Sequence, residues 1–381
     1  MMIQNWVKYI FLLILRFFLD IFNVFPIKNN RIVFYSFNGK QYSCNPRRIS
    51  ECLNEAYPDK NEIIWAFKNP HEMISIIPNN VKTVKYRSLR YYYYAKTARV
   101  IVQNVQGFGE LRRRKGQDVI QTWHASNGYK QQGNYTGVNR RLELLYHKDY
   151  TYVLSGSESM TKRRIRGTMG FTGTILSGTP RMDEIINREH PEWIKKVHEY
   201  FRIKEDIKIL LYAPTWRKDR NIDNYGLNYS IVKESLEARF GGIWVIAVRL
   251  HPNVYKHSLI NESYVLDATK YPDMQELLCA ADGLISDYSS CIWDYSFRYK
   301  PCLLYCGDLK TYGNERNFDI PIKKWHFPVS TSMEELEQEI LSFDEEKFRC
   351  EMEIHHSEMG SLEDGKATSR VCDLINDLVT R

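Results

Sequence analysis

The sequence alternates short, β-rich apolar runs with helix-length segments, and this alternation occurs in two series. The first series consists of residues 31–37, 62–67, 98–105, 118–124, 150–156 and 174–178. The second consists of residues 207–216, 243–252, 264–269, 283–290 and 301–307. Near-continuous apolar runs are typical of parallel strands that helices cover on both faces. The pattern therefore predicts an α/β protein with two doubly wound, Rossmann-like domains, and 381 residues suffice for both.

A polar, helical stretch near residues 185–205 joins the two series and marks the expected boundary. The predicted organisation is an amino-terminal helix over 1–27, a first domain over 28–190 and a second domain over 191–381. Binding sites in open α/β sheets form at the carboxyl ends of the strands. If the two sheets present these edges across a central cleft, residues from both domains meet in one pocket.

The first 25 residues are the most hydrophobic stretch, yet Lys8, Arg16 and Asp20 interrupt them. The uncharged run is too short for a spanning helix. On a helical wheel the polar residues fall within an arc of about 120°, which predicts an amphipathic helix lying in a membrane interface. Burial in a groove of the domain is the alternative. A secretory signal is disfavoured, because Arg16 breaks the apolar region and no small-residue cleavage site follows.

The charge is unevenly distributed. Residues 1–190 contain 29 Lys and Arg against 14 Asp and Glu, whereas residues 191–381 contain 24 against 32. The basic clusters at 112–115 (RRRK) and 162–166 (KRRIR) are therefore expected to meet anionic lipid or an anionic polymer. A solvated basic face is the alternative for either cluster. The chain carries no nucleic-acid-binding motif, so nucleic acid is not an expected partner.

Cysteine spacing and known motifs exclude several classes of protein. The eight cysteines are scattered, which indicates reduced thiols and no zinc site. Walker, GxGxxG and HExxH motifs are missing, so triphosphate, dinucleotide and zinc-protease functions lack their signatures. The sequence predicts no cofactor and leaves the metal requirement open.

One candidate site follows the strand at 118–124, in QTWHASNGYK. His124 ends this strand, and an imidazole with a pKa near 6.5 can take a proton from a substrate hydroxyl. Lys130 lies shortly after it and can meet a phosphate. A histidine that only packs in the fold is the alternative.

Three further motifs end strands of the second series. YAPTWR contains Thr215, RLHP contains Arg249 and His251, and SDYSS contains Asp287, Ser289 and Ser290. Hydroxyls and free amides at a helix start form an anion site, and a cationic pair can stabilise a phosphate during transfer. Ordinary helix capping by the serines and a buried structural histidine are the alternatives.

Taken in order, these motifs resemble the CDP-glycerol glycerophosphotransferase family, which builds teichoic acids and some capsules. The matching pieces are SFNGKQYSCNPRRIS (36–50), QTWHASNGYKQQG (121–133), SGTPRMDEI (177–185), YAPTWR (212–217), RLHP (249–252), SDYSSCIWDYSFRYKPCLLY (286–305) and DGKATSRV (364–371). The chain has Ala-Ser-Asn after the first histidine, where many glycerol-phosphate members have Gly-Thr-Pro. This departure bears on the identity of the substrate.

The resemblance implies a GT-B-like fold with a membrane-associated first domain and a CDP-alcohol donor held by the second. It implies a histidine from each domain at the reaction centre, here His124 and His251, and a serine-bearing donor site, here Ser289 and Ser290. Four residues are expected on the acceptor or membrane side: Trp6, Phe17, Arg47 and Arg113. The expected location is the cytoplasmic face of the cell membrane.

The reaction expected from this resemblance is transfer of a polyol phosphate from CDP-glycerol or CDP-ribitol to a lipid-linked saccharide or polyol-phosphate acceptor, with release of CMP. His124 would deprotonate the acceptor hydroxyl, while His251 and Arg249 stabilise the developing charge. Two rival functions stay open. One is a GT-B glycosyltransferase that uses a nucleotide sugar, and the other is a non-catalytic membrane-surface protein that binds polyanions.

Overall fold

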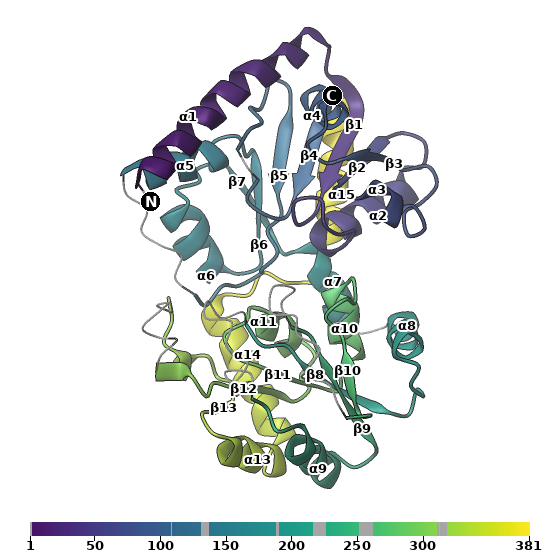
Figure 1. Cartoon of the computed structure of the whole chain (residues 1–381), viewed down its shortest axis with the longest axis vertical. Coiled ribbons are helices and arrows are strands. Elements are labelled where there is room, and N and C mark those ends of the chain that lie inside the picture. The colour runs from purple at the N-terminus through teal and green to yellow at the C-terminus, as the bar shows by residue number, and fades with distance from the viewer. Residues whose placement is uncertain are drawn as a thin grey trace. The chain divides into compact units, whose positions relative to one another are not determined.

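The computed structural model describes residues 2–107, 109–130, 137–187, 190–215, 226–250, 262–310, 312 and 318–381. The chain divides into two compact units (Figure 1). Unit 1 comprises residues 1–126, 132–183 and 362–381, and unit 2 comprises residues 127–131 and 184–361. Each unit is built on a parallel sheet, so the predicted α/β class with two parallel sheets is confirmed.

Unit 1 contains a seven-stranded sheet of order β3-β2-β1-β4-β5-β6-β7. Its strands are β1 (Lys28–Tyr35), β2 (Glu62–Phe67), β3 (Lys82–Lys85), β4 (Ala98–Gln103), β5 (Asp118–Gln121), β6 (Tyr152–Ser155) and β7 (Thr174–Ser177). Its helices are α1 (Met2–Leu19), η1 (Asp20–Val24), α2 (Cys44–Ala56), α3 (Pro70–Met73), α4 (Leu89–Thr97), α5 (Gly137–His147), α6 (Glu158–Met160), η2 (Thr161–Thr168), the start of α7 (Pro180–Asn187) and α15 (Ala367–Thr380).

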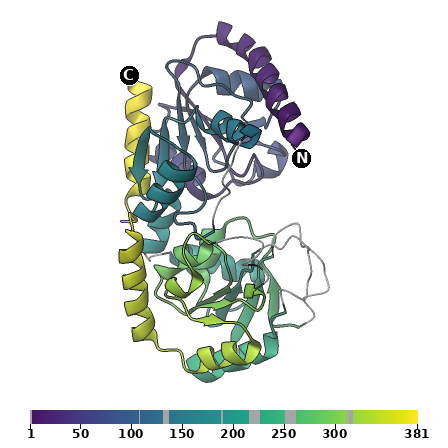
Figure 2. The same cartoon turned by 90° about the vertical axis from the view of Figure 1, so that its left-hand side faces the viewer.

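Strand β1 shows why both faces of this sheet are covered. Ile32 and Phe34 pack into one hydrophobic cluster, which also contains residues of α2 and α15. Val33 and Tyr35 point the opposite way, into a cluster that contains residues of α4 and η2. Side chains alternate between the faces of a strand, so an unbroken apolar run needs two apolar layers. Figure 2 shows α1 and α15 on opposite sides of the sheet.

Unit 2 contains a six-stranded parallel sheet of order β10-β9-β8-β11-β12-β13. Its strands are β8 (Lys208–Tyr212), β9 (Trp244–Val248), β10 (Val265–Asp267), β11 (Gly283–Ser286), β12 (Cys302–Tyr305) and β13 (Val329–Ser330). Its helices are α8 (Pro191–Phe201), α9 (Tyr229–Phe240), α10 (Met274–Ala280), α11 (Cys291–Ser296), η5 (Ile322–Lys324), α13 (Met333–Leu341) and α14 (Glu345–Met359). Every residue of β9 is buried, as a central parallel strand requires.

Each apolar run singled out in the sequence forms a strand. The observed strands are mostly shorter than the runs, because their last residues leave the ladder to form the loops at the carboxyl edge. Strands β3 and β13 were not predicted. β3 has a single fully buried residue in KTVK, and β13 has only two residues, so neither produces an apolar run.

The carboxy-terminal helix corrects the predicted division of the chain. The second domain was expected to extend to residue 381, but α15 belongs to unit 1. Its buried residues Val371, Cys372, Ile375 and Leu378 join the cluster beneath β1 and α2. An amphipathic helix packs against whichever surface buries its apolar face, and its position in the sequence does not indicate which domain provides that surface.

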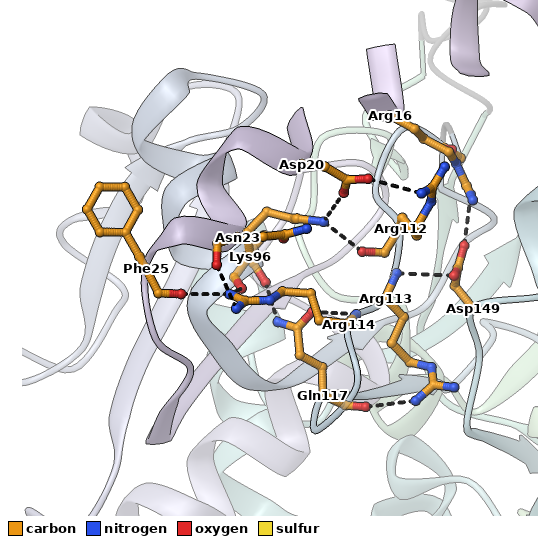
Figure 3. Close-up of polar contacts among 12 residues, drawn as sticks. Arg16, Asp20, Asn23, Phe25, Lys96, Arg112, Arg113, Arg114, Gln117 and Asp149 are labelled. Atoms are coloured by element: carbon orange, nitrogen blue, oxygen red, sulfur yellow. Dashed lines mark hydrogen bonds and ion pairs between the residues drawn. The ribbon is translucent and has the colours of Figure 1, made fainter. Parts of the chain in front are cut away.

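Helix α1 packs with its polar side toward the protein. Arg16 is only 1% exposed and forms an ion pair with Asp149 at 2.8 Å. It also donates hydrogen bonds to the carbonyl oxygens of Gly109 and Leu145. Just beyond α1, Asp20 pairs with the buried Lys96 at 2.7 Å (Figure 3). These contacts use the polar arc of the helix inside unit 1.

The opposite side of α1 is exposed and apolar. Its exposed large hydrophobic residues are Ile3, Trp6, Val7, Ile10, Phe11, Leu13, Ile14, Phe17 and Phe18, and Ile21 and Val24 continue this surface into η1. Contiguous exposed apolar patches mark interaction surfaces. No helix within the described residues is long and apolar enough to cross a membrane. Placement of α1 in a membrane interface stays a prediction.

The basic cluster at 112–115 helps to fasten this helix. Arg112 pairs with Asp20 at 3.1 Å. Arg114 donates to the carbonyl oxygens of Asn23, Phe25 and Lys96 (Figure 3). Two charges expected to face an anionic partner thus hold the end of the amino-terminal segment.

Candidate functional site

The histidine site of unit 1 is built on an unusual backbone turn. After β5, the Thr122 amide still bonds to the carbonyl of Gln103 at 2.8 Å, which continues the pairing with β4. Trp123 then adopts a left-handed conformation with φ of 51°. Such a conformation is rare for a bulky residue, and it concentrates at functional sites. It ends the strand sharply, so that His124 leaves the sheet at the carboxyl edge.

Two side chains that the sequence analysis did not single out hold this turn. The buried amide of Asn45, at the start of α2, donates to the carbonyl oxygens of Thr122 and Trp123 at 3.1 and 2.9 Å. Its own oxygen accepts from the Arg181 backbone amide at 2.9 Å. The Arg181 guanidinium donates to the carbonyl oxygen of His124 and, at 3.1 Å, to Ser126 Oγ. Both residues lie in motifs quoted for the family resemblance, which was the only available signal.

The imidazole of His124 has a defined tautomer. Its Nδ1 lies 3.0 Å from the carbonyl oxygen of Asn104. A carbonyl can only accept, so Nδ1 carries the proton in the neutral ring and Nε2 keeps a free electron pair. Asn104 is itself fixed, because its side-chain amide accepts from Phe37 N and donates to Ser36 Oγ. The residue is nevertheless exposed at the surface of unit 1.

The surroundings of His124 favour the neutral base. Desolvation lowers the pKa of the imidazole, the nearby charges of Arg181 and Arg164 lower it further, and the bond to Asn104 opposes them. The lowered pKa favours the neutral ring, whose Nε2 can accept a proton. This is the arrangement that a general base acting on a hydroxyl requires.

A second group of predicted residues comes together at the carboxyl edge of the unit 2 sheet. Asp287, just after β11, accepts the Thr215 amide at 2.9 Å on both oxygens and the Thr215 hydroxyl at 2.6 Å. It also accepts the Tyr288 amide. Lys130 Nζ lies 3.3 Å from Thr215 Oγ1. The acidic side chain thus orients Thr215, while the lysine supplies a positive charge at the same edge.

Lys130 reaches this place because the segment after His124 is anchored in unit 2. Tyr129 is buried, and its hydroxyl lies 2.8 Å from His355 Nε2. Its ring packs on Trp325 with centroids 4.3 Å apart, and its carbonyl accepts from the Asp319 amide at 2.9 Å. Tyr129 could not be singled out from the sequence, because its partners are remote in the chain.

The remaining donor-site candidates have differing contacts. Ser289 and Ser290 are half-buried at the start of α11, where Ser289 Oγ accepts the Cys291 amide at 3.4 Å and Ser290 makes no side-chain cap. Arg249 donates to the backbone oxygens of Ala268 and Tyr271, which fasten a loop. His251 lies outside the described residues, so its role at the reaction centre stays a prediction.

A model of the CDP-glycerol:poly(glycerophosphate) glycerophosphotransferase family matches residues 17–377. The chain belongs to this family. It is 28% identical to the teichoic acid poly(glycerol phosphate) polymerase of Staphylococcus epidermidis, over 92% of this chain but only 51% of that protein. It is 27% identical to the teichoic acid glycerol-phosphate transferase of Staphylococcus aureus, over 91% of this chain and 92% of that protein. The solved structure of the wall teichoic acid polymerase TagF matches with a TM-score of 0.81 and 25% identity, over 99% of this chain and 97% of that one.

The four acceptor-side or membrane-side candidates of this glycerophosphotransferase-family chain do not form one group. Trp6 and Phe17 are exposed on α1, and the Arg141 guanidinium lies 5.3 Å from the Trp6 ring centroid. Arg47 forms a helical ion pair with Glu51 at 2.7 Å. Arg113 is exposed and donates to the carbonyl of Gln117.

The described residues contain neither a cluster of metal ligands nor a disulfide. No group of three or more His, Cys, Asp or Glu side chains there is arranged to hold a metal ion. All eight cysteines are described, and none of them forms a disulfide.

Proposed function

We propose that this protein transfers a polyol phosphate, with glycerol phosphate as the first candidate, from a CDP-polyol to the hydroxyl of a membrane-linked acceptor in teichoic acid synthesis. The observation that carries the proposal is His124 at the carboxyl edge of unit 1, whose Nδ1 is bonded to the Asn104 carbonyl, so that Nε2 is the basic nitrogen of the neutral ring. Family membership and the names of the relatives, a poly(glycerol phosphate) polymerase and a glycerol-phosphate transferase, support the donor class.

The proposed step is a phosphoryl transfer from the donor to the acceptor hydroxyl. Nε2 of His124 takes the proton of the acceptor hydroxyl, whose oxygen attacks the β-phosphorus of the donor. The bond between that phosphorus and the bridging oxygen breaks, and CMP leaves with the bonding pair. Positioning and electrostatic stabilisation supply most of the rate in such reactions.

Unit 2 is proposed to hold the donor. Lys130 supplies a positive charge for a diphosphate oxygen, and the Thr215 hydroxyl, oriented by Asp287, supplies a polar contact. Asp287 does not itself face the phosphate in this proposal, because its oxygens are engaged by backbone amides and a carboxylate would repel an anion. Ser289 and Ser290 add hydroxyls at the same edge.

The apolar face of α1 is proposed to rest in the interface of an anionic bilayer on the cytoplasmic side. Its polar arc is occupied by Arg16 and its partners, which leaves the apolar face turned outward. Full burial of one Phe side chain is worth about 1.5–3 kcal/mol. Phe17→Ser is therefore expected to weaken partitioning onto vesicles of phosphatidylglycerol and phosphatidylcholine by about 10-fold or more, while Ile76→Ser, an exposed apolar residue elsewhere in unit 1, serves as the control. Equal partitioning of both variants would remove α1 from the contact.

The decisive experiment measures CMP release by the purified protein from CDP-glycerol and from CDP-ribitol, each with a lipid-linked acceptor analogue. Release from one donor that His124→Ala abolishes would establish the reaction class and name the polyol. His71→Ala, an exposed histidine on α3, is the matched control and should behave as wild type. Release of UDP from a nucleotide sugar, with no CMP from either donor, would favour the glycosyltransferase instead.

A further inference from the structure

The turn that follows β1 is tightly wound and lies beside the histidine site. Phe37, Asn38 and Gly39 all adopt left-handed conformations, with φ of 46°, 56° and 77°. The Ser36 carbonyl closes the turn by accepting the amides of Gly39 and Lys40 at 2.9 and 3.2 Å. Left-handed backbone is uncommon for residues other than glycine, above all for a bulky phenylalanine, and it clusters at functional sites. The proposed mechanism assigns no role to this turn.

Packing fixes the turn against unit 1. A Cβ atom on Gly39 would lie 2.9 Å from the Cβ atom of Tyr86, so a larger residue would not fit there. The Gly39 carbonyl accepts the Lys68 amide at 2.7 Å, directly after β2. The far end of the turn is therefore anchored, and Phe37 at its near end has little freedom to move.

Asn104 joins this turn to the imidazole. It follows β4 and is fully buried. Its side-chain oxygen accepts from the Phe37 amide at 2.8 Å, and its side-chain nitrogen donates to Ser36 Oγ at 2.9 Å. Its main-chain carbonyl is the group that lies 3.0 Å from His124 Nδ1. One residue thus holds the strained turn through its side chain and the histidine through its backbone.

The Phe37 ring packs against the imidazole itself. The centroids of the Phe37 and His124 rings are 5.5 Å apart and their planes are inclined by 60°, which is a favourable arrangement for two aromatic rings. A phenyl ring in this position excludes water from part of the imidazole. Desolvation is also the largest cause of the lowered pKa of His124. The histidine is therefore held by a hydrogen bond at Nδ1 and by an aromatic contact, and both contacts involve the same turn.

We infer that Phe37 and Asn104 are positioning residues for His124: Asn104 fixes the tautomer in which Nε2 is the basic nitrogen, and Phe37 fixes the orientation of the ring. The kinetic consequence of this inference rests on the proposed function. A base held in one tautomer and one orientation needs no rearrangement before it accepts a proton. Displacing a reacting group by about 1 Å costs on the order of 100-fold in rate.

NMR titration of the labelled imidazole nitrogens tests the inference in the intact protein without any substrate, with His124→Ala to assign the signal. The neutral ring of wild type should be the Nδ1–H tautomer. Asn104→Ala should give a mixture of both tautomers, because the accepting carbonyl is no longer held by the side chain. Phe37→Ala should move the pKa of His124 upward, because less of the ring is desolvated, and Phe37→Leu should restore part of the shift.

A change within the same turn supplies the matched control. Asn38→Gly gives up the 3.4 Å hydrogen bond from the Tyr86 hydroxyl but keeps the turn, because glycine adopts a φ of 56° without strain. It should leave the tautomer and the pKa of His124 as in wild type. Circular dichroism shows whether each variant is folded, and Phe37→Leu keeps the test informative if Phe37→Ala is not.

CMP release adds a kinetic readout. Phe37→Ala and Asn104→Ala should each lower kcat by about 10-fold to 100-fold and change the KM for donor and acceptor by less than about 3-fold, because the lost contacts act on the base and not on substrate binding. A His124 tautomer and pKa unchanged in both variants, or a raised KM with kcat retained, would overturn the inference. Failure of the wild type to release CMP from any donor would overturn the proposed function, while the titration would still decide whether Phe37 and Asn104 fix the ring.

Discussion

Replacing Asp149 with asparagine should release α1 from unit 1. The substitution keeps an oxygen for the Arg113 amide but leaves the Arg16 guanidinium, only 1% exposed, without its counter-charge. Breaking a buried ion pair by removing one partner costs about 3–5 kcal/mol. Arg16 keeps its bonds to the carbonyls of Gly109 and Leu145, and Asp149 is 16% exposed, so the lower end of about 3 kcal/mol applies.

Hydrogen–deuterium exchange of the amides of α1 measures this loss directly. A decrease of about 3 kcal/mol in the opening free energy corresponds to exchange that is roughly 100-fold faster in the second and third turns. Glu199→Gln, which removes the partner of Lys195 in an exposed helical pair of α8, should change the exchange of its own helix by less than about 3-fold. Exchange of α1 in Asp149→Asn within about 3-fold of wild type would refute the view that the buried pair holds the helix.

Three other expectations concern chemistry and stability. His124→Ala should slow CMP release by about 100-fold to 10,000-fold. The acid limb of the wild-type pH–rate profile should lie below pH 6.5, because the pKa of His124 is lowered and the neutral imidazole is the base. A limb above pH 7 would contradict this role. Thr215→Val should raise the KM for the donor by about 10-fold with little change in the KM for the acceptor, and equal changes in both would count against a donor role. Desolvation alone lowers the pKa of His326, but Glu351 and Glu358 together raise it. The stability from these contacts is therefore fully present below about pH 6.5 and is lost as the pH rises through the raised pKa. Free energies of unfolding in urea should differ between wild type and His326→Gln at about pH 5.5 and converge at about pH 9.

The sequence predicted the parts of the fold that depend on local pattern. Apolar runs such as residues 62–67 and 98–105 became buried parallel strands, because covering both faces of a strand leaves an unbroken apolar signature. Long-range choices left no such signature. The packing of α15 on unit 1 depends on an apolar surface formed by residues remote from it in the sequence. The polar arc of α1 faces the protein because Arg16 pairs with Asp149, which is also remote in the sequence.

The candidate site was predictable to a similar degree. His124, Thr215 and Asp287 could be named because they follow strands, and the parallel strands of a sheet gather their carboxyl ends at one edge; Lys130 was named from its place shortly after His124. The residues that orient them could not. Asn45 precedes the two carbonyls that it holds by 77 and 78 residues, and Arg181 follows the His124 carbonyl that it holds by 57 residues.

The return of the chain to unit 1 sets an order of events during synthesis. Strands β1 to β7 leave the ribosome before unit 2, but the surface formed by Ile32, Phe34 and Leu53 receives its cover from Val371 and Ile375 only after residues 184–361 have been made. Domains usually fold as they emerge, amino-terminal first. Here unit 1 must wait for α15, and most of unit 2 is made in between. Deleting α15 should therefore leave an apolar face of unit 1 open, and a tag or partner fused after Arg381 would be attached to unit 1, the unit that also carries the amino-terminal helix.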